Sequence, residues 1–280
     1  MNYLVYHAHG HIDFFNECIY SIHSFSNVKS DCTIVIYTDH QAYFENRLPE
    51  DLDIIFRNIT IEEIEYWSGP QDFIHRVKIK ILIDFVSGLE GCHNLLYVDT
   101  DTKFLSSIQA IFQSIDEGNF YMHVNEGGIR IGNQFRKLKR FTQSKNIQAN
   151  LIPEAQSMWN AGVLGFKSTD KRLLENVLEL TDTLYPEIPE HTIEQLALSI
   201  VFNQQEGRQL MEAKEFIFHY WDYKGFRVLL QEKIVPEISI DELRLSIDTI
   251  DPEVFSPQVK NKSKLGTLLK KWLQINKDGP

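Results

Sequence analysis

The sequence at residues 95–105 reads LLYVDTDTKFL, a short apolar run followed at once by Asp99, Thr100 and Asp101. An apolar run of this length predicts a buried β-strand. Two carboxylates so close together repel each other and raise each other's pKa unless a cation lies between them. Because residues i and i+2 of an extended segment point to one face, both aspartates can face one cation. The pattern favours a metal site at the end of a strand over the alternative, a solvated turn.

The chain before this stretch predicts the fold class. Short apolar strands and amphipathic helices follow one another in the order β-α-β-β-α-β, which indicates an α/β fold with a mostly parallel, Rossmann-like sheet flanked by helices. The predicted strands are 3–6, 32–39, 51–59 and 95–98, and the predicted helices are 14–25 and 71–86.

The chain after Asp101 is less regular. Residues 127–150, rich in Gly, Gln, Asn and Lys, indicate an excursion or lid. We expect one domain at 1–225 and a helical C-terminal extension with a basic tail at 226–280. The remaining predicted elements are strands at 120–126, 159–166 and 216–221 and helices at 170–184 and 190–204.

Composition excludes several classes of protein. The net charge of −11 over 280 residues argues against a general nucleic-acid binder, which needs a basic face. Cys18, Cys32 and Cys92 form no CxxC pair and suggest no disulfide framework, which fits a reducing cytoplasm. The first residues do not resemble a secretory signal, and no window of about 18 apolar residues occurs. We therefore expect a cytoplasmic protein.

Polar residues gather where the predicted strands end. Ligands of open α/β sheets bind at the carboxyl ends of the strands. Oxygen ligands from the two aspartates select Mg²⁺ or Mn²⁺, and His219 is a third candidate ligand because manganese also accepts imidazole. The alternative for His219 is a hydrogen-bonded core histidine. The residues at the predicted strand ends are His7, Ala8, His9, Thr38, Asp39, Asp99, Thr100, Asp101 and Asn160.

Two segments carry a family resemblance. LLYVDTDTKFL resembles the DxD segment of nucleotide-sugar glycosyltransferases with the GT-A fold, and MWNAGVLGF (residues 158–166) resembles the (F/W)NAGV(L/M) segment of retaining enzymes such as glycosyltransferase family 8 and the glycogenin group. The resemblance extends in short pieces over most of residues 1–225. It implies that Asp99, Asp101 and His219 bind Mn²⁺, which holds the diphosphate of a donor such as a UDP-sugar.

The same resemblance assigns the donor contacts. His7 and Ala8 would lie beside the base and ribose, and Arg76 or Lys78 would reach the donor, the alternative for both being a solvated helix face. His219 with Lys224 is similar to the family's His-x-x-Gly-x-x-Lys element, although Asp222 stands at the glycine position and the lysine comes one residue early. The full set of expected donor contacts is His7, Ala8, Asp39, Arg76, Lys78, Thr100, Ala161, Gly162 and Lys224.

Three residues are expected near the reacting sugar. Glu194-Gln195 resembles the family's Asp-Gln pair, the alternative being a carboxylate that stabilises a helix N-terminus. Asn160 offers a donor and an acceptor to a sugar hydroxyl, and Gly162 allows close backbone approach. The resemblance implies retention of configuration, with the leaving phosphate taking the proton. If inversion occurs instead, Glu194 or Asp182 is a candidate base.

The sequence leaves three functions open. The first is metal-dependent glycosyl transfer from a nucleoside diphosphate sugar to a carbohydrate or lipid-linked acceptor hydroxyl. The second is a haloacid-dehalogenase-like phosphatase, although Lys103 stands where its DxDx(T/V) motif has Thr or Val. The third is a non-catalytic sugar-nucleotide-binding protein. The basic tail from Lys260 predicts either peripheral contact with the inner face of a membrane or a solvated amphipathic helix.

Overall fold

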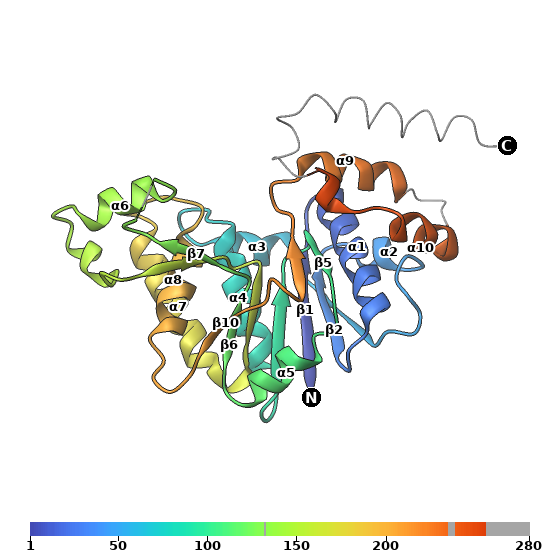
Figure 1. Cartoon of the computed structure of the whole chain (residues 1–280), viewed down its shortest axis with the longest axis horizontal. Helices are drawn as coiled ribbons and strands as arrows, with labels where there is room; N and C mark the ends of the chain where they lie inside the picture. The colour runs from blue at the N-terminus through green and yellow to red at the C-terminus, as the bar shows by residue number, and fades with distance from the viewer. Residues whose placement is uncertain (132, 235–238, 256–280) are drawn as a thin grey trace.

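A seven-stranded sheet forms the centre of the protein (Figure 1). The structure is a computed structural model that describes residues 1–131, 133–234 and 239–255. Neighbouring strands are parallel except on the two sides of β9, so the predicted mostly parallel α/β sheet is confirmed. The strands, in spatial order, are β10 (Leu210–Glu212), β6 (Phe120–Met122), β9 (Val163–Lys167), β4 (Asn94–Val98), β1 (Asn2–Ala8), β2 (Thr33–Thr38) and β3 (Ile54–Asn58).

Helices cover both faces of the sheet, which explains why its central strands are apolar on both sides. Along β1, Leu4 and Tyr6 pack on one face, and Tyr3 and Val5 pack on the other. The first face is covered by α1 (Ile12–Val28) and the second by α4 (His75–Ser87), α7 (Lys171–Leu184) and α8 (Ile193–Asn203). The sequence did not predict α2 (Gln41–Phe44), α3 (Ile61–Ser68) or α5 (Gln109–Asp116).

The excursion contains ordered elements and lies at one end of the sheet, beside α7 and α8 (Figure 1). It comprises β7 (Asn125–Gly128), α6 (Arg136–Thr142), a 3₁₀ helix (Ile147–Leu151) and β8 (Ser157–Trp159), which pairs with β7. The single strands predicted at 120–126 and 159–166 are therefore wrong. Each splits in two, because the Asn160 backbone bonds to residues 123 and 124 and turns the chain there.

The C-terminal elements pack on the face of the sheet that α1 covers. Strand β11 (Ile217–His219) pairs antiparallel with β5 (Thr102–Phe104). Helices α9 (Lys224–Lys233) and α10 (Ile240–Asp248) pack against α1. The predicted boundary at residue 225 falls in the first turn of α9 and stays a prediction, and the basic tail from Lys260 lies outside the described residues. Within the described ranges, no helix combines the length and apolarity needed to cross a bilayer.

Candidate functional site

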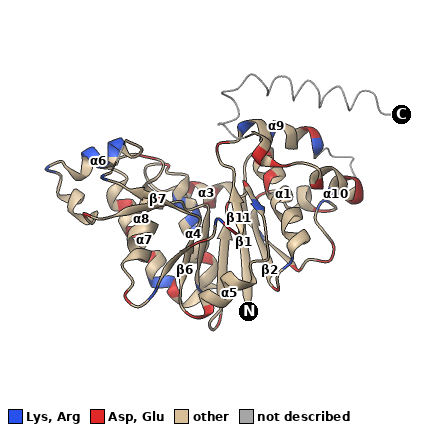
Figure 2. Cartoon of the chain, viewed as in Figure 1, with Lys and Arg blue, Asp and Glu red and all other residues tan. Residues whose placement is uncertain are grey.

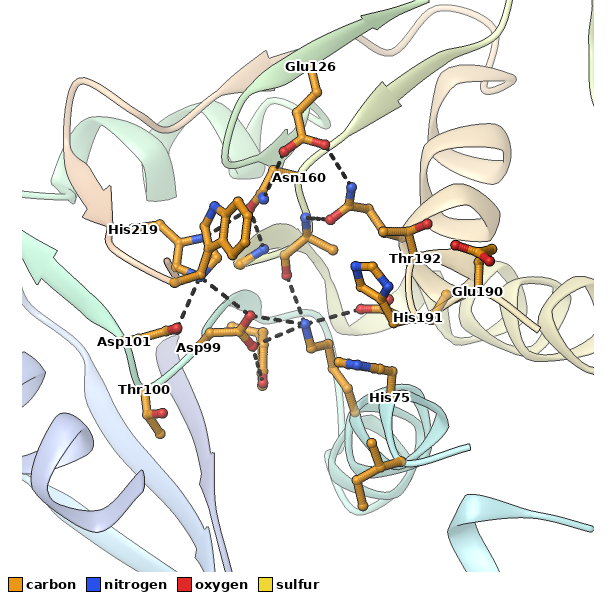
Figure 3. A pocket seen from close by; sticks show the side chains of 18 of the residues that line it. His75, Asp99, Thr100, Asp101, Glu126, Asn160, Glu190, His191, Thr192 and His219 are labelled. Atoms are coloured by element: carbon orange, nitrogen blue, oxygen red, sulfur yellow. Dashed lines mark hydrogen bonds and ion pairs between the residues drawn. The ribbon is translucent and has the colours of Figure 1, made fainter. Parts of the chain in front are cut away.

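A cavity of about 750 Å³ opens at the carboxyl ends of β1 and β4. Residues of the excursion, the start of α8, and β11 complete its wall, so segments far apart in the sequence meet there (Figure 3). The cavity brings together most of the site residues that the sequence suggested. These are His7, Lys78, Asp99, Thr100, Asp101, Asn160, Ala161, Gly162, Glu194, Gln195 and His219.

Asp99, Asp101 and His219 converge on one point of the cavity. One ligand atom from each lies within 4.8 Å of the others. The His219 Nε2 atom is 3.0 Å from Asp101 Oδ1 and 3.9 Å from Asp99 Oδ2. The pairing of β11 with β5 sets His219 opposite Thr102 and so bridges 118 residues of sequence. Two carboxylates and one imidazole form a donor set that fits Mn²⁺, and its oxygen ligands also suit Mg²⁺.

Asn160 fixes the orientation of the His219 ring. The Asn160 Oδ1 atom accepts from the Gly162 backbone N–H at 3.0 Å and lies 3.0 Å from His219 Nδ1. An amide oxygen only accepts, so Nδ1 carries a proton. Nε2 faces the aspartates and donates to Asp101 Oδ1, and a metal ion bound at this point would take the place of that Nε2 proton. A Cβ atom at Gly162 would lie 2.3 Å from the ring. The glycine is therefore needed for the close approach of strand and imidazole.

Lys78 is a buried cation between two carboxylates. Its Nζ atom lies 3.0 Å from Asp99, 3.2 Å from Glu194 and 3.1 Å from the Ala161 carbonyl oxygen. Burial alone lowers the pKa of Lys78, but the two carboxylates outweigh it and raise that pKa. For Asp99, burial raises the pKa, yet Lys78 and His219 prevail and lower it to about 2. Both groups are therefore charged at neutral pH.

Glu126 holds the turn at residues 160–162 from the excursion side. Its carboxylate accepts from Asn160 Nδ2 at 3.2 Å and from Gln195 Nε2 at 3.0 Å. Gln195 in turn accepts from the Ala161 backbone N–H at 3.1 Å. The two amide side chains are thus oriented by a network that joins β7, the turn and α8. Sequence reasoning missed Glu126, because nothing in its neighbourhood showed that β7 returns to the cavity.

Aromatic side chains extend the network towards β1. The Tyr97 hydroxyl donates to Asp99 Oδ1 at 2.8 Å and lies 2.9 Å from His7 Nδ1. The His7 and His9 rings stack, with their centroids 5.0 Å apart. Burial, and then the neighbouring His9, lower the pKa of His7 to about 3. His7 is therefore neutral at physiological pH and donates its Nδ1 proton to Tyr97.

Five residues that the sequence suggested for the site do not line the cavity. Arg76 forms a bidentate ion pair with Asp182, at 2.7 and 2.9 Å. Asp182, the second candidate base, is thereby also outside the cavity. Ala8 is buried in the core, and Asp39 accepts from the Gly10 backbone N–H. Lys224 is the first residue of α9 and is absent from the cavity lining.

Arg227, one turn further along α9, lines the cavity and was missed by sequence reasoning. Its Nε atom lies 2.6 Å from Glu17 Oε1, and its Nη2 atom lies 3.6 Å from Asp101 Oδ2. Burial, and then Asp101, raise the pKa of Glu17 to about 8, although Arg227 opposes this shift. Arg227 therefore brings a positive charge from the C-terminal region to the aspartate pair.

Comparison with known proteins identifies the fold. No protein-family model matches the sequence, and no curated protein is similar to it in sequence. The chain is similar in structure to the galactosyltransferase LgtC in complex with donor and acceptor sugar analogs, with a TM-score of 0.56 and 12% identity over 90% of this chain and 98% of that chain. It is also similar to mouse xyloside xylosyltransferase 1 in its apo form, with a TM-score of 0.54 and 12% identity over 86% of this chain and 96% of that chain. These matches confirm the GT-A fold that the sequence suggested.

Proposed function

We propose that this chain is a metal-dependent glycosyltransferase that moves a sugar from a nucleoside diphosphate sugar, with UDP as the nucleotide, to an acceptor hydroxyl. The observation that carries the proposal is the convergence of Asp99, Asp101 and His219 within 4.8 Å, at the strand ends of a GT-A fold. The glycosyltransferases with similar structures support it. No feature of the cavity favours the phosphatase or the non-catalytic alternative.

The chain's own residues prepare the site for the leaving diphosphate. When bound, Mn²⁺ or Mg²⁺ supplies positive charge that stabilises the departing diphosphate. Lys78 keeps Asp99 ionised, and Asn160 keeps a proton on His219 Nδ1, so that Nε2 is the nitrogen that would bind the metal once its own proton is lost. Arg227 adds the second positive charge that the diphosphate requires. In this proposal Arg227 takes the role that the sequence assigned to Lys224.

Asn160, Glu194 and Gln195 are the proposed sugar-facing residues. Glu194 is bound by Lys78, and the amides of Asn160 and Gln195 are bound by Glu126. These contacts hold the three side chains in place, so their proposed role is to orient the donor sugar. Orientation suits a retaining reaction in which the leaving phosphate accepts the proton of the acceptor hydroxyl. Under inversion, Glu194 is the candidate base that lines the cavity.

A thermal-shift experiment tests the proposal. Ligands that bind only the folded state raise its apparent stability. We expect UDP and Mn²⁺ together to raise the melting temperature more than either alone, and Asp101→Asn to remove most of this shift. Asp116→Asn, an exposed substitution on α5, is the matched control and keeps the shift. An equal shift in wild type and Asp101→Asn contradicts the metal site.

Product analysis distinguishes the three functions. Incubation with UDP-sugars and Mn²⁺ is expected to release UDP, faster when an acceptor is added. Release of orthophosphate from a phosphomonoester, without UDP release, would support the phosphatase. Metal-dependent UDP binding without hydrolysis or transfer to any of a range of acceptors would support the binding protein.

A further inference from the structure

The excursion has a charge opposite to that of the rest of the protein. From β7 to β8 (residues 125–159) it contains six Lys and Arg residues and two acidic residues, Glu126 and Glu154, in a chain whose net charge is −11. Figure 2 shows the positive charge on α6. Such a local concentration of one sign attracts ligands of the other sign. The six cationic residues are Arg130, Arg136, Lys137, Lys139, Arg140 and Lys145.

Part of this positive charge faces the cavity that contains Asp99. Arg136, Lys137 and Leu138 of α6 line that cavity. Leu138 and Phe141 are buried in a small hydrophobic cluster with residues of α7 and α8. Lys137 forms an ion pair with Glu190, just before α8. Helix α6 is therefore a packed wall of the cavity with a defined position.

Arg136 differs from the other charged groups of the cavity. Its side chain is exposed, and among the described residues it has no hydrogen-bond or ion-pair partner. The carboxylates of the aspartate pair already have cations of their own, because Lys78 holds Asp99 and Arg227 lies beside Asp101. Arg136 is thus a cavity-lining guanidinium whose charge no protein group neutralises within the described ranges.

We propose that Arg136 binds a phosphate group carried by the acceptor. This inference rests on the proposed function, which assigns the donor diphosphate to the metal site and Arg227. A guanidinium presents parallel N–H donors that match two phosphate oxygens, and such charge-assisted pairs are strong. The acceptor is therefore an anionic molecule that offers a hydroxyl near Asp99 and a phosphate at α6. That phosphate can belong to a soluble phosphorylated sugar or to a lipid headgroup.

The test uses protein preloaded with Mn²⁺ and UDP, so that the donor site is filled. Glucose 6-phosphate and the neutral control glucose are titrated by calorimetry, and sedimentation measures binding to vesicles of phosphatidylcholine with or without phosphatidylglycerol. We expect binding of glucose 6-phosphate or of the anionic vesicles, but not of their neutral controls. Binding of glucose 6-phosphate identifies a soluble phosphate, and binding of the anionic vesicles identifies a lipid-borne one.

Substitutions then assign the binding to Arg136. Arg136→Gln is expected to lower the affinity for the anionic ligand roughly tenfold to hundredfold, the range for one charged hydrogen-bonded contact. Arg136→Lys is expected to retain part of this affinity. Arg172→Gln, an exposed substitution on α7, is the control and binds like wild type. The thermal shift with Mn²⁺ and UDP is expected to persist in all three variants.

Three results overturn the inference without touching the proposed function. The first is unchanged anion binding in Arg136→Gln, and the second is no anion binding in wild type. The third is loss of the Mn²⁺–UDP shift in Arg136→Gln, which would make Arg136 a donor residue. Absence of that shift in the wild-type protein, by contrast, contradicts the proposed function itself.

Discussion

The two sides of the cavity are built in different ways. On the donor side, Asp99 directly follows β4 and Lys78 lies on α4, and both elements pack in the main core of the sheet. On the excursion side, α6 and β8 rest on a small hydrophobic cluster that they share with α7 and α8, and α6 carries exposed cations. A regular sheet thus holds the groups that need exact mutual distances, and an appended wall carries the exposed guanidinium that we propose binds the acceptor.

Removing Lys78 from the donor side and Lys137 from the excursion side is expected to give the largest difference in the loss of stability. Lys78→Met leaves the Asp99 and Glu194 carboxylates buried without their cation, and losing one partner of a buried ion pair costs about 3–5 kcal/mol. We expect urea denaturation to show this loss and added Mn²⁺ to restore part of it, because the ion also neutralises Asp99. Lys137→Met breaks the more exposed pair with Glu190 on the excursion side, and we expect it to cost at most about 1 kcal/mol. Equal losses of stability in Lys78→Met and Lys137→Met would contradict the distinction between the two sides of the cavity.

The donor side is also the side that the sequence predicted best. Asp99 and Asp101 directly follow a buried strand, and strand ends of open α/β sheets gather at one edge. Their position in the fold therefore follows from local pattern alone. His219 required one more observation, its likeness to the distal histidine of a known family, because 118 residues separate it from Asp101.

The choice between Arg76 and Lys78 shows where sequence reasoning stops. Two residues apart on a helix with 3.6 residues per turn, they point to nearly opposite sides. One had to face the cavity and the other the outside, but the apolar pattern around them fits either assignment. The structure resolves it: Lys78 reaches Asp99, whereas Arg76 turns to Asp182 on α7.

Glu126 and Arg227 were unpredictable for a different reason. Each reaches the cavity through contacts between elements distant in sequence, Glu126 through β7 and Arg227 through the packing of α9 on α1. Such packing depends on tertiary geometry that no local pattern encodes. The excursion was recognised as irregular from its composition, but its small core was not.

Gly162→Ala tests how tightly the donor side is packed. The added Cβ atom would meet the His219 ring at 2.3 Å, so the ring or the strand must move. Overpacking of this kind costs about 1–3 kcal/mol, and we expect a weaker affinity for Mn²⁺ because His219 is displaced. Isothermal titration with Mn²⁺ and urea denaturation measure the two effects. Gly88→Ala, whose Cβ would have an ordinary contact at 3.6 Å, is the control.

Arg227→Gln separates donor binding from acceptor binding. It removes the cation beside Asp101, and we expect the KM for the donor to rise roughly tenfold, equivalent to about 1.4 kcal/mol. Arg136→Gln should leave that KM unchanged. Lys224→Gln, on the same helix but outside the cavity, is the second control. A larger effect for Lys224 than for Arg227 would return the diphosphate contact to the lysine that the sequence indicated.

His23 supplies the smallest expected effect and tests the buried layer formed by α1 on the other face of the sheet. It lies on α1, its Nε2 atom is 2.8 Å from the Arg47 carbonyl oxygen, and burial lowers its pKa. The unfolded chain takes up a proton there below about pH 6.5, whereas the folded protein does so only at lower pH. The free energy of unfolding therefore falls as the pH drops below about 6.5, by at most about 1.4 kcal/mol per pH unit from this residue.

His23→Gln keeps a donor for the Arg47 carbonyl oxygen and removes the titration. Urea denaturation at several pH values measures the free energy of unfolding. We expect this free energy to fall less steeply below about pH 6.5 in His23→Gln than in wild type. His40→Gln, at an exposed position, is expected to keep the wild-type pH dependence. Helix α1 packs against β1 and α9. The loss of stability at low pH that His23 causes is therefore a loss in the sheet and the helices that cover it. An unchanged slope in His23→Gln would mean that acid destabilises the protein through other groups, and that the buried core around α1 is not what limits stability at low pH.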